Sequence, residues 1–234
     1  MSCQAGFDQA ITDSSLVVEG YIFENKPVEN IKLSLVDPII SQTTSLGITD
    51  AEVFIFWNGF YFKLNDATNT GLFSAENSNL KIIAGETYEL IIRYNGKEYE
   101  AVTTVPEPPI QLEANKDTLF INSASDAINV NWSNQDSLWF LGVIAEQNPK
   151  ATDFPFNNFF SIPTQGASLE ITPNDVQNIG NKQFILFGIT DAYEELYRIS
   201  NSSIGSSYDG NLSNGFGIFT AFSSDTLNIV VSDK

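Results

Sequence analysis

The side chain that most often carries enzyme chemistry near neutral pH is missing, because the 234-residue chain contains no histidine. Its absence excludes Ser-His-Asp and Cys-His nucleophilic sites, histidine-ligated zinc and the commonest general base. Carboxylates remain, and a glycosidase needs two of them about 5–10 Å apart, one with a raised pKa. The neighbouring pairs Glu98/Glu100 and Glu194/Glu195 fall on the polar face of a predicted strand and on a predicted helix flank. Such positions are typical of solvated surface carboxylates, so we predict no catalytic residues and no enzyme activity.

Calcium is the metal that the chain is best equipped to bind, because Asp and Asn loops supply hard oxygen ligands. The best cluster lies in SYDGNLSN, with Asp209, Asn211 and Asn214. Its spacing does not match an EF-hand, and Asn or Asp beside Gly is also an ordinary turn former. The glycines of NGFGIF lack the Lys-Ser/Thr of a phosphate-binding loop. Apart from this candidate calcium site, we predict no cofactor.

Aromatic residues form a candidate contact surface in SLWFLGVIAEQNPKATDFPFNNFFSIP. Pro155 and an Asn pair oppose regular structure, so the later part of this stretch is predicted to be a loop. Its four phenylalanines must be buried beneath the loop or contact a partner. Phe lacks the polar edge that Trp and Tyr bring to sugar stacking, which favours a protein partner over a glycan. The candidate partner or ligand contacts are Trp57, Trp139, Phe154, Phe156, Phe159 and Phe160.

The one cysteine, Cys3, stands near the start of the chain and cannot form an internal disulfide. It is either a stray thiol, which would be an oxidation liability, or a lipidation site. Ser2-Cys3 is similar to the end of a lipobox, with Met1 in place of a removed signal peptide. Because acyl chains contribute about 0.8 kcal/mol per buried CH₂, two or three of them would hold the protein at a membrane. We therefore expect a lipid anchor on Cys3, with residues 1–14 as its tether.

Charge limits the partners of the chain. Acidic side chains number 29 against 11 basic ones, a formal net charge of -18. Such a surface cannot gain binding energy by releasing counterions from nucleic acid, and anionic headgroups repel it. We therefore expect no nucleic acid, and membrane attachment only through a covalent anchor or a partner protein.

Alternation of apolar and polar residues predicts an all-β protein of two domains. NIKLSL and AINVNWS alternate as half-buried strands do, and Asn95-Gly96 predicts a type I′ hairpin in GETYELIIRYNGKEYEAVTT. Pro106, Pro108 and Pro109 mark a stiff connector. We therefore expect a first domain over residues 15–106 and a second over 107–234. Two short helices are predicted in the second, from Thr172 in TPNDVQNI and from Asp191 in DAYEELYRIS.

The stretch AEVFIFWNGFYFKLN is more apolar than burial on one face requires. By simple alternation, Phe54, Phe56, Phe60 and Phe62 are expected to point opposite to Val53, Ile55 and Trp57, with a tight turn at Asn58-Gly59. The phenylalanines are either covered by a neighbouring element or form an exposed aromatic platform.

Several segments in order resemble a known family: LVVEGYIFENKPVENIKLSLVDPI, ITDAEVFIF, AGETYELIIRYNGKEYEAVTTVPEPPI, LYRIS and LSNGFGIFTAFSSDT. The chain resembles the uncharacterised lipoproteins of Bacteroidota outer membranes, a domain-of-unknown-function family often encoded beside TonB-dependent receptors. The resemblance implies a transthyretin-like or immunoglobulin-like N-terminal sandwich and a fibronectin type III-like second sandwich. It implies no catalytic residues.

Together these observations predict a non-enzymatic accessory protein, lipid-anchored at the periplasmic face or cell surface of the outer membrane, that binds an outer-membrane receptor. Two alternatives stay open. One is a glycan-binding protein, with or without glycan cleavage, that uses Trp57, Trp139 or nearby Tyr with a carboxylate pair. The other is an adhesin-like structural module, for which no small ligand is expected.

Overall fold

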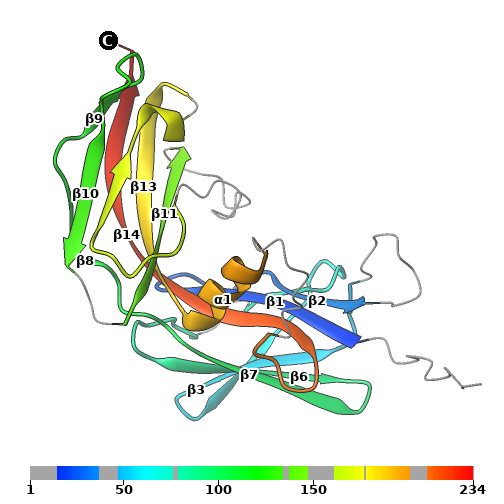
Figure 1. Ribbon diagram of the computed structural model, residues 1–234. Helices are drawn as coiled ribbons and strands as arrows, with labels where there is room; N and C mark the ends of the chain where they lie inside the picture. Colours follow the sequence, from blue (N-terminus) through cyan, green and yellow to red (C-terminus); the bar gives the residue numbers. More distant parts are fainter. Residues whose placement is uncertain are drawn as a thin grey trace, which may run out of the picture.

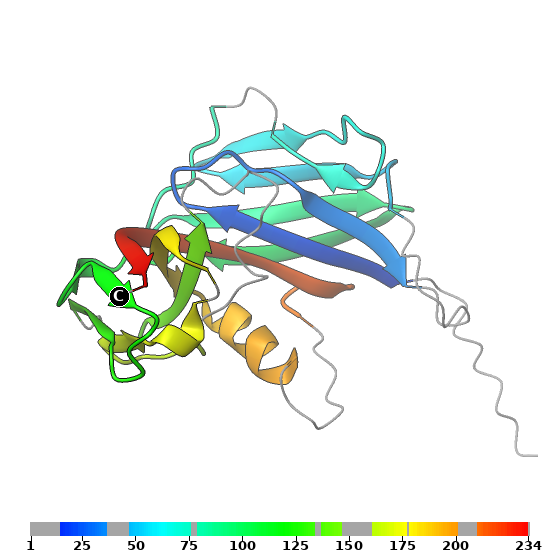
Figure 2. The same ribbon diagram turned by 90° about the horizontal axis from the view of Figure 1, so that it is seen from above.

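The computed structural model describes residues 15–36, 47–75, 79–133, 137–146, 161–176, 178–200 and 210–233. These residues form two β-sandwiches, called here the N-terminal body and the C-terminal body, which meet at an angle (Figure 1, Figure 2). Strands make up most of the described chain, and one α-helix and one 3₁₀ helix accompany them. The predicted all-β class with two sandwiches is therefore confirmed.

In the N-terminal body, a four-stranded sheet packs on one end of a longer sheet. The four-stranded sheet has the order β4-β3-β6-β7 and comprises β3 (Glu52–Trp57), β4 (Phe60–Leu64), β6 (Thr87–Tyr94) and β7 (Lys97–Thr104). Facing it are β1 (Ser15–Phe23), β2 (Ile31–Val36), β5 (Leu72–Phe73) and the first half of β14 (Phe216–Ser232). Alternate residues of both sheets fill one core. The predicted β6–β7 hairpin is confirmed, since Asn95 and Gly96 have φ of 50° and 72°.

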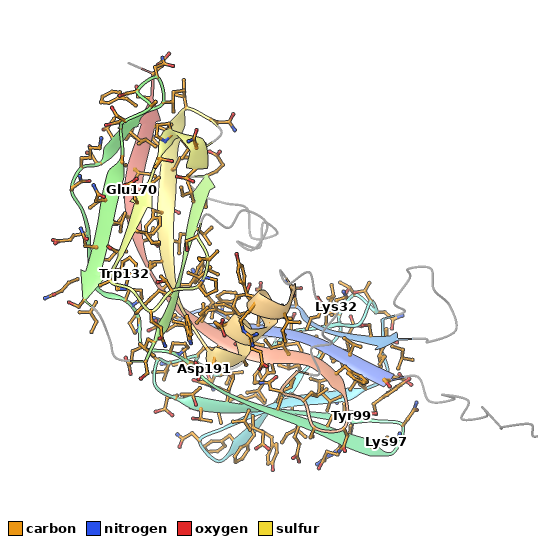
Figure 3. All side chains as sticks on the ribbon, in the orientation of Figure 1. Lys32, Lys97, Tyr99, Trp132, Glu170 and Asp191 are labelled. Atoms are coloured by element: carbon orange, nitrogen blue, oxygen red, sulfur yellow. The ribbon has the colours of Figure 1, made fainter. Side chains whose placement is uncertain are left out.

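In the C-terminal body, a three-stranded sheet packs on the other end of the longer sheet. The three-stranded sheet has the order β12-β10-β8 and comprises β8 (Ile110–Ala114), β10 (Ile128–Ser133) and β12 (Ser168–Ile171). Opposite it lie β11 (Trp139–Glu146), β13 (Gly180–Ile189), the second half of β14, and β9 (Thr118–Phe120), which pairs in parallel with β14. Trp132, labelled in Figure 3, packs edge-to-face on Phe140 in the core between the sheets. This arrangement is the fibronectin type III-like sandwich that was expected.

Both predicted helices are present in the C-terminal half of the chain. The 3₁₀ helix η2 covers Pro173–Asp175, and the Asp175 carboxylate accepts hydrogen bonds from the Thr172 N–H (2.8 Å) and hydroxyl (2.6 Å). Helix α1 covers Asp191–Ser200. The capping box at Thr172 therefore identified the first helix start, and at the second the Thr190 hydroxyl accepts a hydrogen bond from the Tyr193 N–H (3.2 Å).

Strand β14 belongs to both bodies. Its residues 216–222 pair in parallel with residues 17–23 of β1, and its residues 222–231 pair in antiparallel with β13. One seven-stranded sheet thus runs through the whole molecule (Figure 1). The division between residues 106 and 107 stays a prediction, and the structure adds that the N-terminal sheet is completed by residues from near the end of the chain.

The segment that leads into β14 closes the edge of β7. The Ser213 N–H donates to the Glu100 carbonyl (2.7 Å), and the Glu100 N–H donates to the Ser213 hydroxyl (2.8 Å). Close backbone approaches follow: a Cβ on Gly217 would lie 2.0 Å from the Val18 carbonyl oxygen, and one on Gly210 would lie 1.6 Å from the Gly217 oxygen. Only glycine fits at these two positions, since both also have positive φ.

Helix α1 covers a third apolar cluster, in the angle between the two bodies (Figure 1). Asp191, labelled in Figure 3, begins the helix, and Tyr193 in its first turn is buried. The Tyr193 ring packs edge-to-face on Phe222 at 4.9 Å and on Tyr21 at 6.4 Å. Burial raises the pKa of Tyr193, so its hydroxyl stays neutral. The helix therefore stabilises β14 at the residue where this strand passes from one body to the other.

Two carboxylates also meet where the bodies join. The Glu24 N–H donates to the Phe222 carbonyl (2.8 Å), and the Glu107 carbonyl accepts a hydrogen bond from the Ser223 hydroxyl (3.0 Å). Partial burial and the charge of Glu107 raise the pKa of Glu24, against a lowering by the Asn25 amide, which donates to Glu24 Oε1 (3.3 Å). The two like charges oppose each other across the join.

Replacement of Gly217 by Ala is expected to destabilise both bodies together. The added Cβ meets the backbone of Val18, so we expect a loss of about 3–5 kcal/mol in the free energy of unfolding. Gly180→Ala is the control, because Gly180 also has positive φ but nothing within 4 Å of its Cβ position, and we expect about 1–3 kcal/mol there. Thermal unfolding followed by circular dichroism measures both. A second transition that keeps the wild-type midpoint in Gly217→Ala would contradict the shared strand.

Glu24→Gln is expected to stabilise the protein at pH 7. Because the folded-state pKa of Glu24 is raised, the protonated form favours folding below the unfolded pKa, and this contribution is lost as pH rises through the folded pKa. The variant should gain about 0.5 kcal/mol or less at pH 7 and nothing below the ordinary Glu pKa of about 4.3. Exposed Glu29→Gln controls for the change in net charge. Urea unfolding at pH 7 and pH 4 tests this, and an equal gain in both variants would refute it.

Candidate binding surface

The outer side of the four-stranded sheet carries a cluster of apolar side chains. Alternation places Val53, Ile55 and Leu90 in the core with no exposed area. The intervening positions point outward, and they include Phe54, Phe56, Tyr61, Ile91 and Val102, called here the outer aromatic face. The face lies across all four strands, and Tyr61 on β4 and Val102 on β7 are 63% and 54% exposed at its two ends.

The aromatic rings of this face contact one another. The rings of Phe56 and Tyr61 are 4.8 Å apart, and Tyr61 meets Phe54 edge-to-face at 6.4 Å. Ile91 lies directly opposite Phe54 in the sheet and is only 7% exposed although it points away from the core. The cluster is thus a packed apolar surface, with Tyr61 as its most exposed ring.

Charged residues surround the outer aromatic face. The Arg93 guanidinium lies 5.9 Å from the Phe54 ring centre, and its Nε donates to Glu98 Oε2 at 2.7 Å. The hydrogen bond and charge of Glu98 raise the pKa of Arg93, which stays cationic. The remaining charged side chains at outward positions are Glu52, Lys63, Glu89 and Glu100. Four glutamates against one lysine and one arginine leave the face acidic.

Two aromatic side chains of the β3–β4 hairpin lie on the other side of the sheet from the one that the sequence predicted. Phe54 and Phe56 do point away from Val53 and Ile55, but Phe60 and Phe62 do not join them. The Asn58-Gly59 turn has only two residues, so Trp57 lies opposite Phe60 and Ile55 opposite Phe62, and opposed residues share a face. The outward aromatic on β4 is therefore Tyr61. The sequence expectation was wrong here because it alternated residues through the hairpin without allowing for the two turn residues.

Trp57 lies at the end of the N-terminal core. Its ring stacks on Tyr88, with ring centres 5.7 Å apart, and its Nε1–H donates to Glu86 Oε2 at 3.2 Å. The Tyr88 hydroxyl in turn donates to the Lys81 carbonyl (2.6 Å) and accepts from the Ile83 N–H (2.9 Å). Trp57 is half-buried and fixed by these contacts, so it supports the sheet from the side opposite to the outer aromatic face.

Trp139 lies in the other body. It begins β11, opposite Ile189, and packs half-buried against the cluster beneath helix α1. The structure therefore does not bring the two candidate tryptophans to one surface. Phe154, Phe156, Phe159 and Phe160 lie outside the described residues, and their role stays a prediction.

The two described members of the candidate calcium site make structural hydrogen bonds. Asn211 Oδ1 accepts from the Phe219 N–H (2.9 Å), and its Nδ2 donates to the Phe219 carbonyl (2.8 Å), so this side chain pairs with β14 as a strand would. Asn214 Nδ2 donates to the Glu98 carbonyl (3.3 Å). Asp209 lies outside the described residues. Within the described ranges, no three Cys, Asp or Glu side chains come together as metal ligands would. Calcium binding stays a prediction.

The carboxylates show no paired acid and base at the outer aromatic face. Glu98 forms an ion pair with Arg93, and Glu194 lies 3.7 Å from Arg198 on helix α1. Among described carboxylates, the pKa is raised at Glu24, which lies at the join between the bodies. The geometry of the face supports binding through apolar contact and surrounding charge.

The anchor residue Cys3 lies outside the described residues. In the part of the chain that the structure describes, no helix has the length and apolarity needed to cross a bilayer. Membrane attachment through Cys3 therefore stays a prediction.

Comparisons with solved structures give only distant similarity. A segment of two fibronectin type III domains from chicken tenascin matches at 12% identity and a TM-score of 0.27, with 92% of this chain and 99% of that chain covered. The FN1-FN3 domains of chicken CNTN1 match at 11% identity and a TM-score of 0.31, with 95% and 67% covered. Such low TM-scores carry no conclusion, so the fold assignment depends on the strand pairing above.

In sequence, no curated protein matches the chain. A family profile does match it, over residues 4–228, which is nearly its whole length. The chain therefore belongs to the family described as "Domain of unknown function (DUF4249)".

Proposed function

We propose that this protein is a non-enzymatic, lipid-anchored binding protein of the cell envelope, an accessory of a TonB-dependent outer-membrane transporter. The observation that carries the binding role is the outer aromatic face, where exposed Tyr61 packs on half-buried Phe54 and Phe56 on the four-stranded sheet. Contiguous apolar surface of this kind typically marks an interaction site. The absence of histidine and the dispersed carboxylates support a role without catalysis.

The position of the protein is inferred from Cys3 and from the resemblance to outer-membrane lipoproteins noted above. A lipid on Cys3 would be separated from β1, which begins at Ser15, by a tether of roughly 40 Å at full extension. This length lets the folded bodies contact a membrane protein without contacting the anionic headgroups, which the net charge of -18 on the whole chain disfavours.

Glycan binding is the second candidate, and Tyr61 favours it. Its exposed ring carries a hydroxyl beside Phe56, and Glu89 lies opposite Phe56 in the sheet. A ring with a polar edge next to a carboxylate suits a sugar better than phenylalanine alone does. Glycan cleavage needs an acid with a raised pKa near the bound sugar. Glu24 has a raised pKa, but it lies at the join between the bodies and not at the outer aromatic face, so cleavage is less well supported. An adhesin-like module would bind neither a transporter nor a small ligand through this face.

The anchor is tested with Cys3→Ala in the full-length protein in cells. We expect the wild type to incorporate labelled palmitate and to sediment with the outer membrane, and the variant to do neither. The fold should be unchanged, because residue 3 precedes β1. Equal membrane recovery of the two proteins, with no label on the wild type, would contradict the anchor.

The binding role is tested with Tyr61→Ala in the tethered protein. After crosslinking in cells and detergent purification, we expect the wild type to retain a TonB-dependent transporter and Tyr61→Ala to lose most of it. Ile110→Ala is the matched control, since Ile110 is an exposed apolar residue of β8 in the other body. Recovery of the transporter with all three proteins would exclude the outer aromatic face. Binding of a glycan array by the wild type, lost in Tyr61→Ala, with no transporter recovered, would favour the second candidate.

A further inference from the structure

The free edge of β4 offers unpaired main-chain groups. In a hairpin with a two-residue turn, the residues that flank the turn form a hydrogen-bonded pair, and such pairs recur at every second residue. Trp57 and Phe60 flank the turn, so Phe60 and Phe62 direct their N–H and C=O groups at β3. The main-chain groups of Tyr61 and Lys63 therefore point the other way, toward the edge of the sheet.

The opposite edge of the same sheet obeys the same rule and is closed. Tyr94 and Lys97 flank the β6–β7 turn, so Glu98, Glu100 and Val102 direct their main-chain groups away from β6. Each of the three receives a hydrogen bond from the segment before β14: Asn214 to Glu98, Ser213 to Glu100 and Asn211 to Val102. The segment before β14 thus closes this edge along the outward-pointing residues of β7.

The β4 edge is closed only at its end. Asn65, just after β4, exchanges two main-chain hydrogen bonds with Ser74, at 2.9 and 3.0 Å. Among the described residues, none hydrogen-bonds the outward main-chain groups of Tyr61 or Lys63. The side chains here are the most exposed aromatics that the described residues contain, since Phe60 is 66% and Tyr61 is 63% exposed. Four main-chain groups and two aromatic rings thus face solvent together.

We propose that β4 is a strand-addition site that takes an extended, net basic segment of a partner protein as a fifth strand of the sheet. This inference rests on the proposed function, for which it names the contact. An added strand would complete the hydrogen bonds of Tyr61 and Lys63, and its alternate side chains would contact Tyr61 on the outer side and Phe60 on the other.

Charge selects a basic partner over a second copy of the chain. Across its four strands the outer aromatic face holds four glutamates, two of them on β7, against Lys63 on β4 and Arg93 on β6, and the whole chain carries -18. A second copy would bring the same charge to the edge, which opposes β4-to-β4 pairing. A segment that alternates basic and apolar residues can place its basic side chains on the outer side, with Tyr61 and the glutamates, and its apolar side chains beside Phe60 on the other side.

The test separates main-chain pairing from side-chain contact at one position. Lys63→Pro removes the outward N–H and leaves the hydrogen bonds of Phe60 and Phe62 to β3 in place, since proline is tolerated on an edge strand. Lys63→Ala, the matched control, removes the same side chain and keeps the N–H. The probe is a short peptide that alternates Val and Lys, and its Val-Glu counterpart is the charge control. Amide chemical shifts and hydrogen exchange report binding, and slow exchange at Phe60 and Phe62 confirms that β4 is folded in each variant.

We expect the Val-Lys peptide to shift and protect the Tyr61 and Lys63 amides of the wild type and to bind Lys63→Ala similarly. Lys63→Pro should bind it about tenfold more weakly, and the Val-Glu peptide should not bind. Equal binding of the two variants, saturation at other residues or no saturable shift would overturn the proposal. A wild-type dimer that Lys63→Pro converts to monomer would also overturn it, in favour of a second copy.

The tethered variants distinguish this inference from the proposed function. If Lys63→Pro loses the peptide but still retains the transporter as Lys63→Ala does, the transporter does not use β4 and the inference fails while the function stands. If the peptide results are as expected but no transporter is recovered with the wild type, the strand-addition site stands and the proposed function fails.

Discussion

The parallel pairing of β14 with β1 is the interaction on which the rest of the structure depends. It is made by residues that are about two hundred positions apart in the chain, so its formation closes a very long loop. The same strand then continues as the partner of β13, so neither body has a complete sheet until β14 is in place. Phe222 pairs with both β1 and β13. Its ring packs against the rings of Tyr21 and Tyr193, so helix α1 contacts the same strand. Because both bodies share this strand, we expect the two sandwiches to unfold together in one transition.

This closure also determines where a partner finds free main-chain groups. The segment that carries the chain into β14 covers β7 through Asn211, Ser213 and Asn214, and β14 itself covers β1. What stays open in the four-stranded sheet, among the described residues, is the part of β4 that precedes Asn65. Asn211 bonds to Val102 of β7 and to Phe219 of β14 and so links the two sheets of the N-terminal body, and the exposed aromatics Phe60 and Tyr61 lie at the opposite edge.

Sequence reasoning succeeded where a feature depends on neighbours in the chain. Local patterns predict the Asn95-Gly96 hairpin, the helix capped at Thr172, the helix that begins at Asp191 and the alternating strands. It failed where a feature depends on distant pairing. No local pattern shows that residues 216–222 complete the N-terminal sheet or that Asn211 acts as a strand partner of Phe219. The side of the sheet on which Tyr61 lies could have been predicted. Counting residue pairs across the two-residue Asn58-Gly59 turn places Tyr61 beside Phe56.

The acidity of the chain and its open aromatic edge are physically consistent with each other. An uncovered edge strand is a liability, because copies of a protein can pair through it. Paired strands lie about 4.8 Å apart, well inside the Debye length of about 8 Å at physiological ionic strength, so charges flanking such a pair are poorly screened. With a net charge of -18, two copies that met at β4 would repel each other over the distance at which main-chain bonds form. The same field attracts a basic strand. Net charge therefore disfavours self-association through the open edge and favours the basic partner proposed above.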